Sequence, residues 1–295
     1  MRIPVARHRH SRNAWQLMRL SFCGDQVRRY DNDRYLMALH APASRRDALF
    51  ALYAFNVEVA KTREAVSEPM IGQIRLQWWR DAIEQAYSGS VRDHAVLRPL
   101  AQAIEQYGLT RGYFDNLLDA REFDLTDEPP ATIDELRTYA EGTTSTLIRL
   151  ALEILDHRTG AAQEAAQGIG IAWGLTGLLR AVVFHARGKR QYLPAHSMRE
   201  AKADPDDLFE LRGSAPLTDV AREVADAARQ ALRSGRLHRR GVPRAAIPAL
   251  LPGTLAEMYL RRMARLDHDL FAQPIEISQP ARQLRMLCTL ILGRY

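Results

Sequence analysis

The chain has 295 residues, of which 46% are hydrophobic and 26% are charged, a balance that suits one globular protein with a well-filled core. Low-complexity tracts and internal repeats are absent from the sequence, which excludes disordered and solenoid architectures. The formal net charge of +6 favours anionic partners, but the sequence contains no nucleic-acid recognition motif, so we expect no nucleic-acid partner.

The first 25 residues are basic, with no acidic residue before Asp25. The arginines in this segment include Arg2, Arg7, Arg12 and Arg19. Such a composition is typical of an organellar targeting peptide, but it also suits a flexible arm on an arginine-rich bacterial protein. We predict a flexible basic arm over residues 1–25 and a single helical domain over residues 26–295.

The next part of the chain predicts two long helices. Residues 44–68 contain neither glycine nor proline, and Ser44 followed by Asp47 resembles a capping box. Pro69 suits the first turn of a second helix that runs to about Ser88 and stops at Gly89. Earlier in the chain, Asp31 and Asp33 are spaced like a metal-binding pair, but a helix N-cap is the preferred interpretation.

Further capping residues indicate that helices continue to the end of the sequence. These are Asp93 and Thr110 as N-caps, Gly108 as a C-cap and the pair Thr132 and Glu135 as a capping box. The remaining helices are predicted over residues 132–156, 161–187, 218–234, 254–271 and 281–292. No segment alternates apolar and polar residues between hairpin turns, so the sequence predicts an all-α bundle with a loop excursion over residues 194–216.

Two features indicate the compartment. Cys23 and Cys288 lie near opposite ends of the chain, which argues against a disulfide framework and favours a reducing environment. The longest mostly apolar run, residues 168–179, stops at Arg180 and is shorter than the roughly 20 residues of a membrane-spanning helix. We expect a cytoplasmic bacterial protein, either free or attached peripherally to the inner membrane.

A cluster of basic residues precedes residue 245. It consists of Arg233, Arg236, His238, Arg239, Arg240 and Arg244. A solvated helix end is the preferred interpretation, and a peripheral contact with anionic lipid is the alternative.

Two stretches carry the most specific information. Residues 49–79 read LFALYAFNVEVAKTREAVSEPMIGQIRLQWW, and residues 175–194 read LTGLLRAVVFHARGKRQYLP. Their motifs and spacing resemble the squalene/phytoene synthase family. The resemblance implies an isoprenoid-synthase-like helical bundle around a central cavity, with helix 44–68 facing helix 161–187 across it.

Active members of that family hold magnesium ions with aspartates on two facing helices, and the metal ions bind the diphosphate of the substrate. Here the corresponding positions are Ala60, Lys61 and Glu64 in the first motif and Gly177, Ala181 and His185 in the second. Only Glu64 is acidic, and Lys61 places a cation among the ligands. Because an octahedral magnesium ion requires at least one or two carboxylates, we expect no metal cofactor unless the protein is an active prenyltransferase.

Other family positions are retained, namely Arg180, Arg190 and Tyr192. The candidate cavity or ligand-binding residues are Tyr53, Lys61, Glu64, Glu68, Gln77, Arg180, His185, Arg190 and Tyr192. Two of these have simpler alternatives: Lys61 and Glu64 are spaced to form an ion pair on one helix, and His185 also suits a buried core histidine.

The altered motifs are similar to one branch of the family, which includes mitochondrial complex I assembly factors. The resemblance implies a non-catalytic role in assembling the respiratory NADH dehydrogenase, through a client subunit, an assembly partner or an isoprenoid or lipid-like ligand in the cavity. The alternative is an active prenyltransferase that joins two prenyl diphosphates head to head.

Overall fold

The computed structural model describes residues 20–64 and 68–295, and these residues form helices and no β-strand. The predicted all-α class is therefore confirmed. The α-helices are α1 Phe22–Tyr30, α2 Asn32–Leu39, α3 Ala43–Ala60, α4 Pro69–Tyr87, α5 Leu97–Tyr107, α6 Arg111–Glu122, α7 Ile133–Ala140, α8 Thr146–Ile154, α9 Gly160–Arg180, α10 Val182–Arg187, α11 Ala195–Glu200, α12 Pro205–Phe209, α13 Ala215–Leu237, α14 Ile247–Arg265 and α15 Gln279–Leu292.

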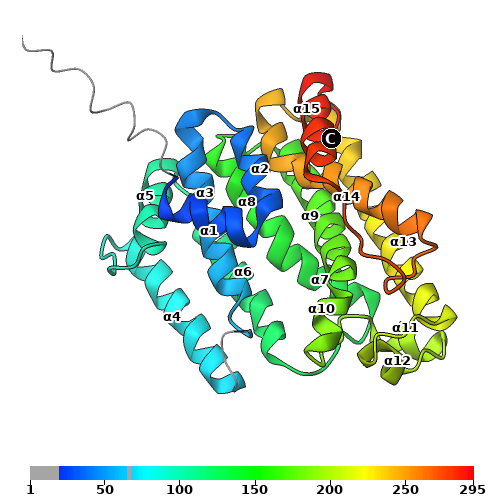
Figure 1. Cartoon of the computed structure of the whole chain (residues 1–295). Helices are drawn as coiled ribbons and strands as arrows, with labels where there is room; N and C mark the ends of the chain where they lie inside the picture. The colour runs from blue at the N-terminus through cyan, green and yellow to red at the C-terminus, as the bar shows by residue number, and fades with distance from the viewer. Residues whose placement is uncertain (1–19, 65–67) are drawn as a thin grey trace, which may run out of the picture.

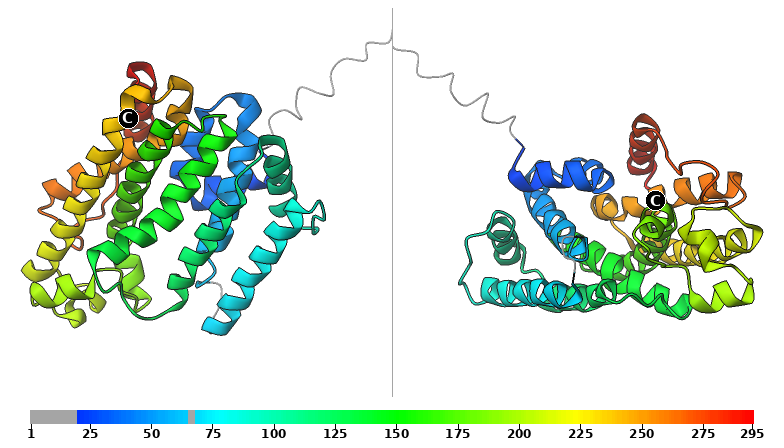
Figure 2. Two further views of the ribbon diagram at one scale, coloured as in Figure 1. Left: turned by 180° about the vertical axis from the view of Figure 1, so that it is seen from behind. Right: turned by 60° about the horizontal axis from the view of Figure 1, so that its bottom comes forward.

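The long helices lie side by side around α9, as Figures 1 and 2 show. Seen from behind in Figure 2, a row runs from α4 through α6, the α7–α8 run and α9 to α13, and neighbours in this row contact each other. Helix α3 packs on α1, α5 and α8. The buried apolar side chains form one continuous cluster that extends from Cys23 to Tyr295.

Several predicted helix boundaries are confirmed by their capping contacts. Pro69 begins α4, and Gly108 ends α5 with a left-handed conformation at φ 58°. The hydroxyl of Thr132 accepts a hydrogen bond from the backbone N–H of Glu135 and caps α7. Asp31 caps α2 in the same way, by accepting from the backbone N–H of Arg34.

Other boundaries differ from the prediction. The helix expected over residues 44–68 ends at Ala60, and residues 61–64 form a turn. Helix α5 is capped by the His94 ring, whose Nδ1 accepts from the backbone N–H of Leu97, so Asp93 is not its N-cap. The chain bends at Ala181, which divides the predicted helix 161–187 into α9 and α10. Neither glycine nor proline marks these positions, so local sequence gave no sign of them.

The predicted N-terminal arm and the predicted loop excursion both contain helical residues. The predicted arm over residues 1–25 lies mostly outside the described residues, but α1 begins at Phe22 because the Ser21 hydroxyl accepts from the backbone N–H of Gly24. The excursion over residues 194–216 contains the short helices α11 and α12. In the described part of the chain, no helix has the length and hydrophobicity needed to cross a membrane.

Helices α9 and α13 approach each other unusually closely at two glycines. A Cβ atom on Gly168 of α9 would lie 2.5 Å from the backbone nitrogen of Gly235 in α13 and 2.6 Å from the carbonyl oxygen of Ala231. Both contacts are with backbone, which cannot rotate out of the way. Only hydrogen at these positions permits the crossing, so glycine is required here for packing.

We expect Gly168→Ala to destabilise the protein by about 3 kcal/mol, because the added methyl group forces α9 and α13 apart. Gly177→Ala in the same helix is the matched control, since a Cβ there meets nothing within 4 Å. The control should stabilise the protein by about 0.5–1 kcal/mol through helix propensity. Urea unfolding of the two variants measures both effects, and equal stability would contradict the close packing.

Candidate functional site

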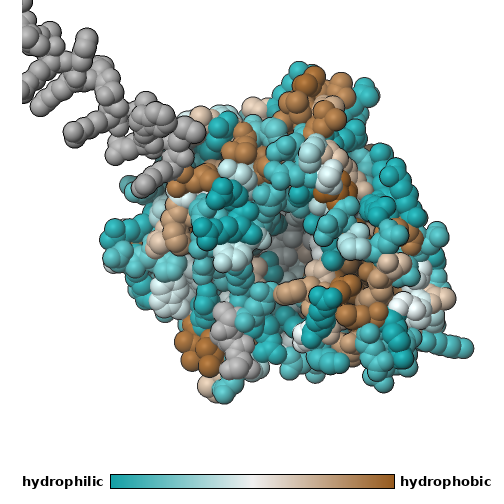
Figure 3. All heavy atoms as spheres, viewed as in Figure 1, coloured by the Kyte–Doolittle hydropathy of each residue, from teal (hydrophilic) through white to brown (hydrophobic). Residues whose placement is uncertain are grey.

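A cavity of about 690 Å³ lies where the end of α3 faces the junction of α9 and α10. The face of the molecule shown in Figure 3 is hollowed near its centre. The lining residues are Ala60, Arg63, Glu64, Arg121, Asp124, Tyr139, Leu178, Phe184, His185, Arg187, Gly188, Arg190 and Tyr192. The two helices predicted to face each other across a cavity thus both contribute to this lining.

Cations outnumber acids around this cavity. The arginines are Arg63, Arg121, Arg187 and Arg190, against the acids Glu64 and Asp124. Glu64 is exposed, whereas Asp124 is only 5% exposed. The lining therefore favours an anionic group over a cation.

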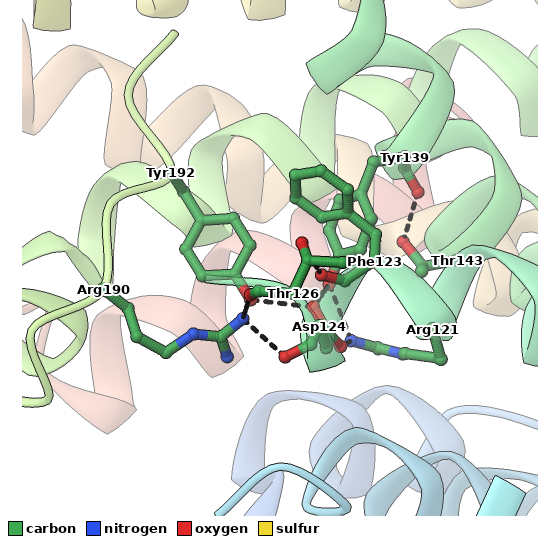
Figure 4. Close-up of polar contacts among 8 residues, drawn as sticks. All are labelled: Arg121, Phe123, Asp124, Thr126, Tyr139, Thr143, Arg190 and Tyr192. Atoms are coloured by element: carbon green, nitrogen blue, oxygen red, sulfur yellow. Dashed lines mark hydrogen bonds and ion pairs between the residues drawn. The ribbon is translucent and has the colours of Figure 1, made fainter. Parts of the chain in front are cut away.

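Asp124 is the centre of a buried polar network, shown in Figure 4. One carboxylate oxygen accepts hydrogen bonds from the hydroxyls of Tyr139 and Tyr192, each at 2.7 Å. The other oxygen accepts from the guanidinium of Arg121 at 3.0 Å. Arg190 donates to the backbone carbonyl oxygen of Asp124 at 2.6 Å. The network therefore joins α6, α7 and the segment after α10 at one wall of the cavity.

Burial and the Asp124 charge fix the protonation of this network. Burial first, and then the nearby carboxylate, raise the pKa of Tyr139 well above 10, against the opposing effect of the Arg121 charge. The pKa of Tyr192 is raised for the same reasons. Both hydroxyls remain protonated and donate to Asp124, which is therefore held as an acceptor by three donors.

His185 stands next to this network, with its ring centroid 4.5 Å from that of Tyr192. Burial, followed by the charge of Arg190, lowers the pKa of His185 from 6.5 to about 4, although Asp124 opposes the shift. The imidazole is therefore neutral at physiological pH. A neutral imidazole adds no positive charge to the lining and can accept as well as donate a hydrogen bond.

This pKa predicts a pH dependence of stability. Between pH 6.5 and about 4 the unfolded chain binds a proton at His185 that the folded protein does not. The stability contributed by neutral His185 is therefore complete above pH 6.5 and is lost as the pH falls towards 4. We expect the wild type to lose on the order of 2 kcal/mol more than His185→Gln over this range, measured by urea unfolding. Equal losses of stability in the wild type and in His185→Gln would contradict the burial of the His185 imidazole.

A second, smaller cavity of about 340 Å³ lies beside α2 and α9. Asp33 is buried there and forms ion pairs with Arg180, at 3.3 Å, and with Arg282 of α15. The guanidinium of Arg180 also lies 3.7 Å from the centroid of the Tyr259 ring. Both carboxylate oxygens of Asp33 are therefore paired with arginines, and the carboxylate is not available to a metal ion.

The predicted site residues fall in different places. Glu64, His185, Arg190 and Tyr192 line the larger cavity, and Arg180 lines the smaller one. Lys61 is part of neither lining, because its ammonium group lies over the ring of Tyr30. Its role in ligand binding remains a prediction.

The other three candidates are not among the residues that line either cavity. Tyr53 is buried in α3, with the Arg34 guanidinium 6.0 Å from its ring centroid. Gln77 is exposed on α4 and donates to Asp81 at 2.8 Å. Glu68 is exposed at the start of α4, where its side chain makes no capping hydrogen bond.

The residues of the larger cavity do not fit a magnesium cluster. The lining contains two carboxylates, Glu64 and Asp124. Asp124 already accepts three hydrogen bonds from protein groups, so among the described lining residues Glu64 is the one carboxylate that could bind a metal ion. Within residues 20–64 and 68–295, no three His, Cys, Asp or Glu side chains are arranged to hold a metal ion. The donor set therefore lacks the carboxylates that magnesium requires.

Sequence reasoning missed Arg121, Asp124 and Tyr139. Arg121 and Asp124 are three residues apart, a spacing that suggests a local ion pair but equally suits an exposed helix end. Their importance depends on Tyr192, which is 68 residues further along the chain. A contact of that range leaves no periodic pattern in the sequence.

Comparison with known protein families gives a consistent result. A model of the squalene/phytoene synthase family matches residues 27–284. A Bos taurus protein called NADH dehydrogenase (ubiquinone) complex I, assembly factor 6, is 35% identical over 250 residues, which cover 85% of this chain and 75% of the relative. The chloroplastic phytoene synthase of Daucus carota is 27% identical over 207 residues, which cover 66% of this chain and 51% of that protein.

Several solved structures have a fold similar to that of this chain. A dehydrosqualene synthase in complex with a ligand has a TM-score of 0.81 at 18% identity and covers 92% of this chain and 94% of that one. Squalene synthase HpnC from Alicyclobacillus acidocaldarius has a TM-score of 0.75 at 19% identity, covering 84% and 93%. At these identities the similarity establishes the fold alone.

Proposed function

The chain belongs to the squalene/phytoene synthase family, and we propose that it acts as an assembly factor for the respiratory NADH dehydrogenase and not as a prenyltransferase. The observation that carries this proposal is the donor set of the larger cavity, where arginines outnumber acids and the carboxylates that would hold magnesium are missing. The relatives named complex I assembly factor 6 support the same role.

The cavity suits a ligand or client with an anionic group. Arg63 and Arg187 both line it, and Phe184 and Leu178 add apolar surface to the same lining. An isoprenoid-like or lipid-like molecule with a charged head group has both features, as does an apolar client segment with an acidic residue. Arginine can bind such a group directly, without a bridging metal ion.

The test is complementation of a host strain that lacks the gene. We expect the deletion to reduce assembled NADH dehydrogenase, measured by native gel electrophoresis with activity staining, and the wild-type gene to restore it. Arg187→Glu should restore it only poorly, because the substitution reverses the charge of an exposed cavity arginine that forms no ion pair within the described residues.

Arg199→Glu is the matched control, since Arg199 is exposed on α11 and outside the cavity lining. It should complement fully. Unchanged enzyme levels in the deletion strain would refute the assembly role. Normal complementation by Arg187→Glu would instead place the function outside the cavity.

The alternative function, head-to-head condensation of two prenyl diphosphates, is supported by the fold and by the more distant phytoene synthase relative. The missing carboxylates argue against it. A peripheral membrane contact, predicted from the basic charge of the chain, is part of our proposal.

A further inference from the structure

Helix α15 carries an apolar face on its outer side. Met286 and Thr289 point inward and are buried, and the Thr289 hydroxyl lies 3.1 Å from that of Thr254 in α14. On the opposite side, Leu284, Leu287 and Ile291 are 63%, 47% and 64% exposed. Their spacing of three and four residues places them on one stripe. A surface helix normally presents polar residues in this direction.

Ion pairs hold the inner side of α15 firmly to the bundle. Arg282 pairs with Asp33 of α2, and Arg285 lies 3.6 Å from Glu257 of α14. The outward direction of the leucines is therefore fixed by the packing of the helix. Figure 3 shows an apolar patch at the edge of the molecule, where Figure 1 places α15.

Positive charge surrounds this apolar stripe. Residues 236–246 and 277–295 contain no aspartate or glutamate. Their arginines are Arg236, Arg239, Arg240, Arg244, Arg282, Arg285 and Arg294. The two segments meet in space, because Arg244 lies against Gly293 and Arg236 donates to the carbonyl oxygen of Tyr295.

Four of these arginines are available to a partner. Arg239, Arg240, Arg244 and Arg294 are exposed and form no ion pair within the part of the chain that the structure describes. A second copy of the chain would bring a like charge against this surface, which disfavours self-association. A bilayer with anionic lipids instead offers negative head groups above an apolar interior, which complements both the arginines and the leucines.

We infer that the outer face of α15, with the flanking arginines, is the surface by which the protein lies on an anionic membrane. Leu284, Leu287 and Ile291 would enter the boundary between head groups and acyl chains, and Arg244 and Arg294 would contact lipid phosphates. This inference deepens the proposed peripheral contact and orients the molecule on the bilayer. It does not require the NADH dehydrogenase.

The experiment is flotation of the purified protein with vesicles of phosphatidylcholine, with and without phosphatidylglycerol. We expect binding to the anionic vesicles only, weakened by salt. Leu284→Gln combined with Ile291→Gln should weaken binding by about tenfold or more, because two apolar side chains no longer enter the membrane. Arg244→Glu combined with Arg294→Glu should weaken it to a similar degree, by about tenfold.

Met70→Gln combined with Ile74→Gln is the matched control, since these side chains on α4 are 68% and 64% exposed. This variant should bind as the wild type does. Thermal unfolding of all variants, together with sedimentation, checks folding and oligomeric state.

Three results would overturn the inference: no binding of the wild type to anionic vesicles, unchanged binding of the α15 variant, or a wild-type dimer that the α15 substitutions dissociate. The last would identify the stripe as an interface between copies. Because no NADH dehydrogenase is present in the assay, any of these results would leave the assembly role standing.

Discussion

Replacing Asp124 by alanine is expected to lower the free energy of unfolding by about 3–5 kcal/mol. The substitution leaves the Arg121 charge buried without a counterion and removes the acceptor for the hydroxyls of Tyr139 and Tyr192. Unsatisfied buried donors and an uncompensated buried charge are among the most costly defects in a folded protein. Urea unfolding followed by circular dichroism measures the loss.

The control is Asp119→Ala, which also removes a carboxylate bound to an arginine. Asp119 pairs with Arg80 but its side chain is 65% exposed, so the substitution should cost less than about 1 kcal/mol. Asp124→Asn should fall between the two, because the amide oxygen can still accept from the tyrosines. A similar small effect for Asp124→Ala and Asp119→Ala would show that the network does not stabilise the fold.

We expect no magnesium-dependent release of diphosphate when the protein is incubated with farnesyl or geranylgeranyl diphosphate. In metal-dependent prenyl transfer, bound magnesium neutralises the charge that develops on the departing diphosphate. Here Glu64 is the one carboxylate at the six positions expected to hold metal, and Gly177 and Ala181 offer no side-chain ligand. The measurement is a diphosphate-release assay combined with extraction of the lipid products.

An active phytoene synthase assayed in parallel provides the positive control. Sustained release that EDTA abolishes would refute the non-catalytic assignment. In that case Glu64→Ala would show whether the remaining carboxylate is responsible. Release that persists in EDTA but disappears in Arg187→Glu would instead indicate chemistry that depends on the arginines of the cavity.

The sequence alone predicted the helical class, because capping residues mark where helices start and glycines mark where they end. Thr132 and Gly108 act through contacts within a few residues, and the structure confirms both. Neither glycine nor proline marks the end of α3 at Ala60 or the bend at Ala181, so the local sequence does not indicate them.

The candidate site was predictable only in part, for a similar reason. Family positions drew attention to His185, Arg190 and Tyr192, which do line one cavity. No sequence pattern indicates Asp124, because its hydrogen-bond partners come from three separate segments of the chain. Lys61 was expected in the same cavity, but the early end of α3 turns it towards Tyr30.

The close glycine crossing has a mechanical consequence for the cavities. Gly168 lies near the middle of α9, and the backbone of α13 sets the spacing of the two helices there. The last turn of α9, which includes Gly177 and Leu178, borders both cavities before the chain bends at Ala181. A side chain larger than hydrogen at position 168 would therefore shift the wall that α9 contributes to both cavities, although residue 168 lines neither of them.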